Sequence, residues 1–525
     1  MKIKLLTATL LAGACSICFS QDLAYDTAFG NNGMTTTTIN ENGDALLSLV
    51  LQPDGKIVSS VGFDFSLNGN EGLIRYNSDG SIDTTFGNNG IVLTSLVDEN
   101  AFNNNLKLLA DGRILIVGSK STVPNNSNYD YFNFAMAMYL PDGTPDLSFG
   151  TNGILQTDFA GHGDVAKAID IQPDGKIIVA GYVTITWASH TTFGIARYNP
   201  DGSLDTGFGQ DGFVVGDFED DPQRIEYAHY IKWVDEKIIV GGSTSIYDNQ
   251  DIDDMAIAVL RINADGSPDT TFGANGRVVT SFALEQDVYT FLPAPDGGIY
   301  AAGSIDQSGV TNALLIKYNS DGSLDAGFGD NGKVIFNDSL FPGSVISRLL
   351  LHDGKILCSG TVYDGTEVNL MLMRYNLNGS IDTSFGSNGI FAFDINGNQI
   401  DYSIDMLLQP DGKLVMGGWT GVTQNDNHSV LTRMQFDNLY VAGLKSDLCT
   451  TWPNPFTSSI NIHSDDEIFS ADLFDISGRR ITDISVVHLP DRREATLKVP
   501  EALSNGIYIL NVSNGKKSSA IKVIK

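Results

Sequence analysis

The motif Asp-x-x-Phe-Gly-x-x-Gly recurs seven times along this chain and constrains its fold more than any other feature. A second motif, centred on Asp-Gly, lies between the copies and is clearest at Gln52–Lys56, Gln172–Lys176 and Gln409–Lys413, whereas Asp235–Lys237 is a degraded form. A unit of about 60 residues that repeats in this way indicates a repeat architecture. The phenylalanines of the first motif are Phe29, Phe86, Phe149, Phe208, Phe272, Phe328 and Phe385.

The residues around each motif predict its local structure. Short apolar runs such as Ala168–Ile171 and Lys176–Gly181 flank the Asp-Gly centre, which predicts a tight hairpin because Asp and Gly tolerate positive φ angles. The other motif, as in Tyr198–Gly209, predicts a longer connector between repeats. Its two Asp side chains are expected to bond local amides, and Phe208 is expected to pack between neighbouring sheets.

One unit predicts four short strands and shows no helical period. The strands are Ile91–Ser95 after the Phe-Gly turn, Leu106–Leu109 and Ile114–Gly118 around Asp-Gly, and Phe134–Tyr139 before the next connector. Four strands in each of seven repeats predict an all-β fold, a seven-bladed β-propeller, followed by a small C-terminal β-sandwich. An open solenoid is the alternative, because solenoids also repeat.

The two ends of the array complement one another. The last repeat stops at Arg433–Asn438 without its connector, while Leu23–Gly30 supplies the missing half near the N-terminus. We therefore expect the two segments to meet and latch a ring. A strand within one blade and a turn between blades both fit this pattern.

The repeat resembles a known family. Tyr318–Gly332 reads Tyr-Asn-Ser-Asp-Gly-Ser-Leu-Asp-Ala-Gly-Phe-Gly-Asp-Asn-Gly, which is similar to the delta-60 repeat of secreted bacterial proteins. The resemblance extends over about residues 22–438. It implies a propeller-like fold and brings no established activity.

The N-terminus predicts export. Lys2 and Lys4 precede an apolar run and small residues that end at Ser20, which is typical of a secretory signal peptide over residues 1–20. A lipoprotein signal ending before Cys15 is the alternative, although Ala12 stands where Leu is usual. No later stretch approaches the roughly 20 apolar residues of a transmembrane helix. Two of the four Cys lie in this leader, so no disulfide framework is expected.

The charge of the chain is unevenly distributed. The formal net charge is −31, yet the segment from Thr450 onward contains nine Lys and Arg against nine Asp and Glu. The acidic excess therefore lies before the tail and argues against nucleic acid or an anionic membrane as a partner. It is compatible with cation binding, a basic partner or simply a solvated acidic surface.

The tail has a different character. It opens with Trp452–Phe456, and its alternating apolar residues predict a β-sandwich. It looks like the type A C-terminal sorting domain of type IX secretion in Bacteroidetes. The residues that carry this resemblance are Pro453, Asn454, Pro455, Gly478, Arg479, Gly506, Tyr508, Lys522 and Lys525.

The resemblance implies an export route and a division of the chain. After Sec export, the type IX machinery would take the protein across the outer membrane, followed by release or surface attachment. The predicted parts are the signal peptide 1–20, the propeller 21–440, a linker 441–451 and the sorting domain 452–525. An ordinary carbohydrate-binding or adhesive sandwich is the alternative reading of the tail.

A four-strand meander places the repeated turns on one face and the variable loops on the other, where we expect any glycan or protein ligand to bind. These loops are Ser121–Tyr131, Thr184–Thr192, Ser243–Asp254, Asp306–Thr311, Tyr363–Val368 and Gly421–His428. The sequence contains no His-x-x-x-His pair and no Gly-x-Ser-x-Gly elbow, so no catalytic residue is predicted. The expected function is a binding or structural module, and the alternative is a polysaccharide-active hydrolase or lyase with an acidic pocket at the ring centre.

No cofactor is predicted, but calcium is an alternative. Asn77–Asp83 resembles an oxygen-rich calcium loop that lacks the terminal bidentate acid, and Asp248–Asp254 is a second dense acidic loop. Turn capping explains the same aspartates. Trp187, Trp233 and Trp419 fit either a sugar-stacking surface or packing in the core.

Overall fold

The computed structural model describes most of the chain, and every regular element within the described part is a β-strand. The chain divides into two compact units, Met1–Asn438 and Leu439–Lys525. The described residues are 22–39, 43–63, 70–94, 105–123, 131–159, 161–186, 190–218, 225–248, 251–282, 284–395, 400–421, 427–437, 449–452, 456–464, 466–468, 470–475, 480–481, 484–488, 493–500, 503, 507–513 and 518–525.

Five four-stranded antiparallel sheets make up most of the first unit. Each is a meander of strands consecutive in the sequence. The first sheet contains β3 (Asp44–Leu51), β4 (Ile57–Phe63), β5 (Asn70–Tyr76) and β6 (Ile91–Leu93), and the second contains β7 (Asn105–Leu108), β8 (Ile114–Ser121), β9 (Phe132–Tyr139) and β10 (Ile154–Thr157). The third contains β11 (Asp164–Ile171), β12 (Ile177–Thr186), β13 (His190–Tyr198) and β14 (Phe213–Val215), and the fourth contains β15 (Glu226–Val234), β16 (Lys237–Asp248), β17 (Asp251–Asn263) and β18 (Arg277–Thr280). The fifth contains β19 (Gln286–Pro293), β20 (Ile299–Asp306), β21 (Thr311–Tyr318) and β22 (Lys333–Ile335).

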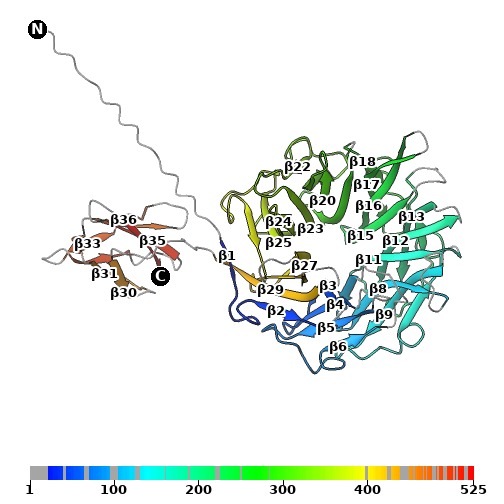
Figure 1. The fold of residues 1–525 in the computed structure, drawn as a ribbon, viewed down its shortest axis with the longest axis horizontal. Coiled ribbons are helices and arrows are strands. Elements are labelled where there is room, and N and C mark those ends of the chain that lie inside the picture. The colour runs from blue at the N-terminus through cyan, green and yellow to red at the C-terminus, as the bar shows by residue number, and fades with distance from the viewer. Residues whose placement is uncertain are drawn as a thin grey trace, which may run out of the picture. The chain divides into compact units, whose positions relative to one another are not determined.

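The remaining strands of this unit form a nine-stranded sheet. Its two meanders are joined by a single parallel pair, Val368 with Ile400. Together with the five sheets they are arranged around a common centre (Figure 1), so the unit consists of propeller-like repeats. The nine strands are β1 (Asp22–Tyr25), β2 (Met34–Thr37), β23 (Gly343–His352), β24 (Lys355–Tyr363), β25 (Val368–Asn376), β26 (Ile390–Phe393), β27 (Ile400–Leu408), β28 (Leu414–Gly421) and β29 (Asn427–Asp437).

The strand after each Phe-Gly turn belongs to a different sheet from the one predicted. Ile91–Ser95 was expected to open a new unit, but β6 pairs with β5, through Gly72 with Leu93 and Ile74 with Ile91, and so completes the preceding sheet. The connector therefore lies within a sheet and not between repeats. The reason is tertiary: the chain turns back on β5 because that strand still offers a free edge.

The two ends of the repeat array meet, as the sequence predicts. Both β1 and β2 pair with β29, and Met34 lies opposite Thr432. The N-terminal segment thus supplies the outer strand of the last meander. Such pairing is what a ring requires and what an open solenoid lacks.

The Asp-Gly turns are of two kinds. Asp353 and Gly354 form the predicted tight turn, with positive φ of 49° and 68° between the paired residues His352 and Lys355. In Gln52–Lys56 only Gly55 has a positive φ, of 84°, and Asp54 instead accepts a hydrogen bond from the Lys56 amide. The degraded turn is of the tight kind, since Asp235 and Glu236 both have positive φ, 47° and 62°. Two residues in this conformation form the turn that best matches the twist of the flanking strands.

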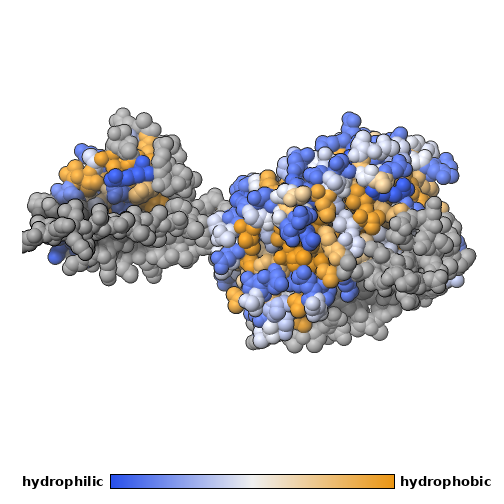
Figure 2. All heavy atoms as spheres, turned by 90° about the horizontal axis from the view of Figure 1, so that it is seen from above, coloured by the Kyte–Doolittle hydropathy of each residue, from blue (hydrophilic) through white to orange (hydrophobic). Residues whose placement is uncertain are grey.

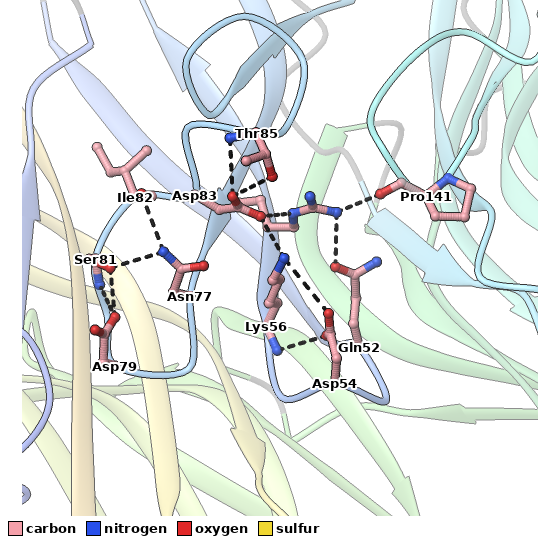
Figure 3. Close-up of polar contacts among 11 residues, drawn as sticks. Gln52, Asp54, Lys56, Asn77, Asp79, Ser81, Ile82, Asp83, Thr85 and Pro141 are labelled. Atoms are coloured by element: carbon pink, nitrogen blue, oxygen red, sulfur yellow. Dashed lines mark hydrogen bonds and ion pairs between the residues drawn. The ribbon is translucent and has the colours of Figure 1, made fainter.

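A charged cluster recurs between neighbouring sheets. Arg75 of β5 donates from Nε to Asp83 at 2.8 Å and from Nη1 to the Pro141 carbonyl of the next sheet at 2.5 Å. Its guanidinium also lies 4.5 Å from the centroid of the Phe86 ring, which is buried. Figure 3 shows Asp83 at the centre of this cluster, with Lys56 as its second cation at 3.0 Å.

The same cluster explains why Asp and Phe have fixed places in the connector. The arginine neutralises the carboxylate, covers the aromatic ring and ties one sheet to the next. Sequence reasoning found the Asp and the Phe but missed the Arg. The equivalent pairs are Arg197–Asp205, Arg261–Asp269, Arg374–Asp382 and Arg433–Asp26, while Arg113–Asp146 and Lys317–Asp325 are variants.

The second unit has two sheets, ordered β30-β31-β34-β33 and β32-β35-β36. One hydrophobic cluster contains residues of both sheets, including Ile462 and Leu497 of the first and Leu473 and Leu510 of the second. The strands are β30 (Cys449–Trp452), β31 (Ser459–Ser464), β32 (Ser470–Asp475), β33 (Ser485–His488), β34 (Glu494–Lys498), β35 (Ile507–Ser513) and β36 (Ser518–Ile524).

Candidate functional site

The first strand of the meanders carries a β-bulge that directs a side chain toward the common centre. In β11 the register shifts between Ala166 and Ala168, so Lys167 has no partner on β12. A bulge re-aims the extra residue and is common next to functional sites. The equivalent shifts fall at Leu47, His229, Tyr289, Ser347 and Ile404.

Glycines opposite the bulges make this geometry attainable. Gly181 pairs with Ala166, and a Cβ at Gly181 would lie 1.9 Å from the Val165 carbonyl oxygen. No side chain fits at that distance. The same collision, at 1.8 to 1.9 Å, would occur at Gly242, Gly303, Gly360 and Gly418.

The bulged residues line one cavity of about 300 Å³ at the centre of the meanders. The volume lies at the lower end of the range for small-molecule sites. A second cavity, of about 280 Å³, shares Asn105, His229, Tyr289 and Arg348 with the first. The lining of the first cavity consists of Leu47, Asn105, Lys167, His229, Tyr289, Ser347, Arg348, Tyr402, Ser403, Ile404 and Trp419. We call the two together the axial cavity.

The axial cavity differs from the acidic pocket that the sequence suggests. The described lining of the first cavity contains Lys167 and Arg348 but no carboxylate, and the second contains one, Asp405. The acidic surplus of the chain arises elsewhere, at turn aspartates such as Asp79 and Asp201.

Burial perturbs the titratable groups at this site. Desolvation lowers the pKa of Lys167 to about 8, and the charge of Glu71 opposes that shift. Desolvation, followed by the charge of Lys167, lowers the pKa of His229 to about 4, so this imidazole is neutral near pH 7. Burial also raises the pKa of Glu71 well above its ordinary value, which favours the protonated form. Perturbed groups gathered at a cavity are a signature of functional sites.

Two carboxylates form ion pairs with the cations that line the second cavity. Asp405 accepts hydrogen bonds from Arg348 Nε at 3.0 Å and from the Leu49 amide at 2.8 Å, so it connects three inner strands. Asp170 accepts from Lys232 Nζ at 3.1 Å and lies 3.6 Å from Lys107 Nζ. These contacts hold the inner strands together, which is a structural role.

Aromatic rings form another part of the wall. The rings of Tyr402 and Trp419 are stacked, with centroids 4.7 Å apart and planes at 24°. Tyr289 is 41% exposed although it lines the cavity, so its surface is accessible. Of the three Trp considered from the sequence, Trp419 thus lies at the cavity, Trp233 packs against a hydrophobic core cluster, and Trp187 lies outside the described residues.

The connector aspartates are already satisfied by the protein. Asp79 Oδ1 accepts from the Ser81 amide and hydroxyl, at 3.0 and 2.6 Å, and Asp83 binds Thr85 and two cations. Within the described part of the chain, no three His, Cys, Asp or Glu side chains are grouped to hold a metal ion. The side chains of Asp248 and Asp251–Asp254 lie outside it.

The variable loops are only partly described. Tyr363–Val368 is a short turn in which Asp364 accepts hydrogen bonds from the amides of Thr366 and Glu367. Elsewhere on the surface, apolar side chains lie among polar ones (Figure 2), and the most exposed, such as Leu93 and Leu340, come from separate elements. Single exposed apolar residues are normal, so the axial cavity remains the strongest candidate site.

Most of the predicted sorting residues lie outside the described part. Tyr508 of β35 is buried and its ring lies 6.3 Å from that of Phe456, while Lys525 Nζ donates to the Pro500 carbonyl at 3.3 Å. Lys522 lies opposite Ile509 in the β35–β36 pair. Pro453, Asn454, Pro455, Gly478, Arg479 and Gly506 are outside the described residues.

Sequence comparison finds a family match within each part of the chain. A domain of unknown function described as a DUF5122 β-propeller matches residues 52–86, 172–208, 235–272, 294–328 and 352–385. A secretion system C-terminal sorting domain matches residues 450–525. No curated protein matches the sequence. The chain thus carries DUF5122 propeller repeats, with which the delta-60 name is consistent, and a type IX sorting domain.

Three solved structures show distant similarity to this chain. The polysaccharide lyase Uly1 is 14% identical, with a TM-score of 0.47 over 79% of this chain and 92% of its own. Semaphorin 2a from Drosophila is 9% identical, with a TM-score of 0.45 over 93% and 96%. A PL25 ulvan lyase is 10% identical, with a TM-score of 0.45 over 75% and 95%. Similarity at this level does not bear on function.

Proposed function

We propose that this chain is a cell-surface or secreted binding protein, whose seven-bladed propeller takes a ligand into the axial cavity. The count of seven rests on the five separate sheets and the two meanders of the nine-stranded sheet. The observation that carries the proposal is the set of bulges: the bulged side chains of six inner strands, together with Asn105 of a seventh, line one cavity. Lys167, His229 and Tyr289 supply this lining with polar groups that can bind a ligand.

The sorting domain indicates that the protein is secreted or displayed at the surface and interacts with the type IX machinery. We propose the parts 1–20 as signal peptide, 21–440 as propeller, 441–451 as linker and 452–525 as a sorting sandwich. The shared hydrophobic cluster of the two tail sheets supports the sandwich. Among the described residues, no helix is long and apolar enough to cross a membrane.

A glycan panel tests the binding function. The mature protein is incubated with each glycan, and both retention and the release of new reducing ends are measured. We expect retention without release, and we expect Trp419→Ala to reduce it because Trp419 lines the cavity. Retention that Trp419→Ala leaves unchanged, but that exchange of the Ser243–Asp254 loop abolishes, would move the site to the variable loops.

The second candidate is a polysaccharide lyase, and the neutral His229 favours it. A lyase needs a base that takes a proton from the sugar and a cation that stabilises the resulting negative charge. His229 and Lys167 supply both types at the axial cavity. A hydrolase would need two carboxylates flanking the bond, whereas the described lining contains one, Asp405. Release of unsaturated ends that stops in His229→Ala would establish the lyase.

A further inference from the structure

The axial cavity carries positive charge within an acidic protein. The described lining of its two cavities contains four cations and one carboxylate, while the whole chain has a formal net charge of −31. The cations are Lys107, Lys167, Lys232 and Arg348, and the carboxylate is Asp405; a second carboxylate, Asp170, lies outside the lining near Lys107 and Lys232. A cavity whose sign opposes that of the surrounding surface attracts and holds anions.

Lys167 is the cation without a compensating ion pair. Lys107 and Lys232 lie near Asp170, and Arg348 is bound to Asp405. Among the described residues, no carboxylate lies within ion-pair distance of Lys167 Nζ, and the contact identified for this atom is with the Tyr182 ring, 6.0 Å from its centroid. The carboxyl group of Glu71 also acts electrostatically on Lys167, but burial favours the protonated form of Glu71, which carries no charge. A buried cation of this kind gains free energy from an anionic ligand.

The rings beside this charge favour a ligand with a flat apolar face. Tyr402 and Trp419 form a stacked pair on the cavity wall, and Tyr289 belongs to the same lining. Sugar rings present C–H groups on one face and hydroxyls at the edge. Aromatic walls with a few polar groups suit such a molecule.

We propose that the axial cavity binds an acidic saccharide, a sugar whose carboxylate lies against Lys167 and whose ring packs on the Tyr402–Trp419 pair. The inference rests on the proposed function, since it names the ligand class of the same cavity. His229 and Ser347 offer uncharged hydrogen-bonding groups to the hydroxyls.

Calorimetric titration of the mature full chain tests the ligand class. The probes are a tetrasaccharide of uronic acids, the neutral cellotetraose of equal length, and acetate. The variants are Lys167→Met, which removes the charge but keeps an aliphatic chain, and Trp419→Ala. Lys333→Met is the matched control, because Lys333 lies on the outer strand β22 and loses the same charge.

We expect the uronic tetrasaccharide to bind the wild type and Lys333→Met equally, and Lys167→Met at least about tenfold more weakly. Trp419→Ala also weakens binding, while cellotetraose and acetate do not bind. The affinity falls as the pH rises above about 8, because Lys167 loses its proton, and Lys167→Met abolishes this dependence. The titratable groups that face Lys167 are Glu71, Tyr182 and His229.

Other outcomes separate this inference from the proposed function. Equal binding of cellotetraose, insensitive to Lys167→Met but lost in Trp419→Ala, overturns the acidic class and leaves the axial site standing. Acetate binding as tight as the tetrasaccharide overturns the saccharide. Uronic binding unaffected by both cavity variants, or no uronic binding at all, overturns the inference. If the uronic tetrasaccharide binds but neither cavity variant weakens it, the axial binding site is overturned as well.

Discussion

Asp26 and Arg433 lie 407 positions apart in the sequence, yet Arg433 Nε donates to Asp26 Oδ2 at 2.8 Å in a buried ion pair. The pair is one copy of the recurrent Arg–Asp cluster, assembled from the two ends of the repeat array. In the other copies both partners belong to one sheet, which local chain geometry brings together. Here the contact exists only if the ends meet.

Breaking this pair should destabilise the ring closure. We expect Asp26→Ala to lower the free energy of unfolding by about 3–5 kcal/mol, because it leaves Arg433 buried without its carboxylate. Denaturant unfolding of the propeller measures the change. Asp54→Ala is the matched control: Asp54 is an exposed turn residue that caps the Lys56 amide, and its loss should cost about 1 kcal/mol or less. Equal effects of the two changes would contradict a latch.

Glycine at the bulges should be indispensable. In Gly303→Ala the new Cβ would lie 1.9 Å from the Asp287 carbonyl oxygen, which is backbone and cannot rotate away. We expect a loss of at least about 2 kcal/mol in unfolding free energy, together with weaker ligand binding, because the strand beside Tyr289 must shift. Gly207→Ala is the control, since the nearest atom there is 3.4 Å away, and it should be close to neutral. A bulge that tolerates Ala would mean that the inner strand is not held in place.

Buried carboxylates should make the propeller less stable as the pH rises from about 4 to 7. Burial raises the pKa of Asp164 and of Glu226 to about 7 in the folded state. Because the folded protein binds these protons more tightly than the unfolded chain, their stabilising effect is complete below about pH 4 and is lost by about pH 7. Each group contributes at most roughly 4 kcal/mol.

Amide variants check this dependence. Asp164→Asn keeps an acceptor for the Phe159 amide, and Glu226→Gln keeps one for Thr192, so both should raise the melting temperature at pH 7 and flatten its decline between pH 4 and 7. Carboxylates with lowered pKa, such as Asp269 at about 2, act only below about pH 4. The lowered pKa of His229 acts in the opposite direction between about pH 4 and 6.5, but this residue is the same in the wild type and both variants, so its effect cancels in the comparison. A steeper decline in the variants would show that these carboxylates are charged in the folded state.

The tail should be dispensable for the propeller but needed for export. A chain that ends at Asp437 should keep the melting temperature of the propeller and remain in the periplasm of a cell with type IX secretion. Residues 450–525 fused to an unrelated folded reporter should carry it out, since this segment matches the sorting domain. Protease accessibility on intact cells measures the export of the truncated chain and of the reporter fusion. Surface display of the truncated chain would contradict the sorting role.

The sequence by itself determined the turns and strands of this protein and the sorting domain that directs its export. Each Asp-Gly and Phe-Gly turn is specified by residues within a few positions, because Asp caps nearby amides and Gly adopts positive φ. The number of repeats, the strands between them and the meeting of Leu23–Gly30 with Arg433 follow from this local pattern. So does the sorting tail, whose recognition depends on a linear match.

The tertiary structure determined which sheet each strand joins and which side chains line the axial cavity. Whether Ile91–Leu93 pairs with β5 or opens a new sheet depends on which edge is free, a property of the folded array. The bulge at Lys167 likewise depends on strand register: Gly181, which makes it attainable, lies on the partner strand and has meaning only once that register is known. The axial cavity therefore emerges from non-local pairing, since its walls come from inner strands far apart in the sequence and no window of neighbouring residues contains it.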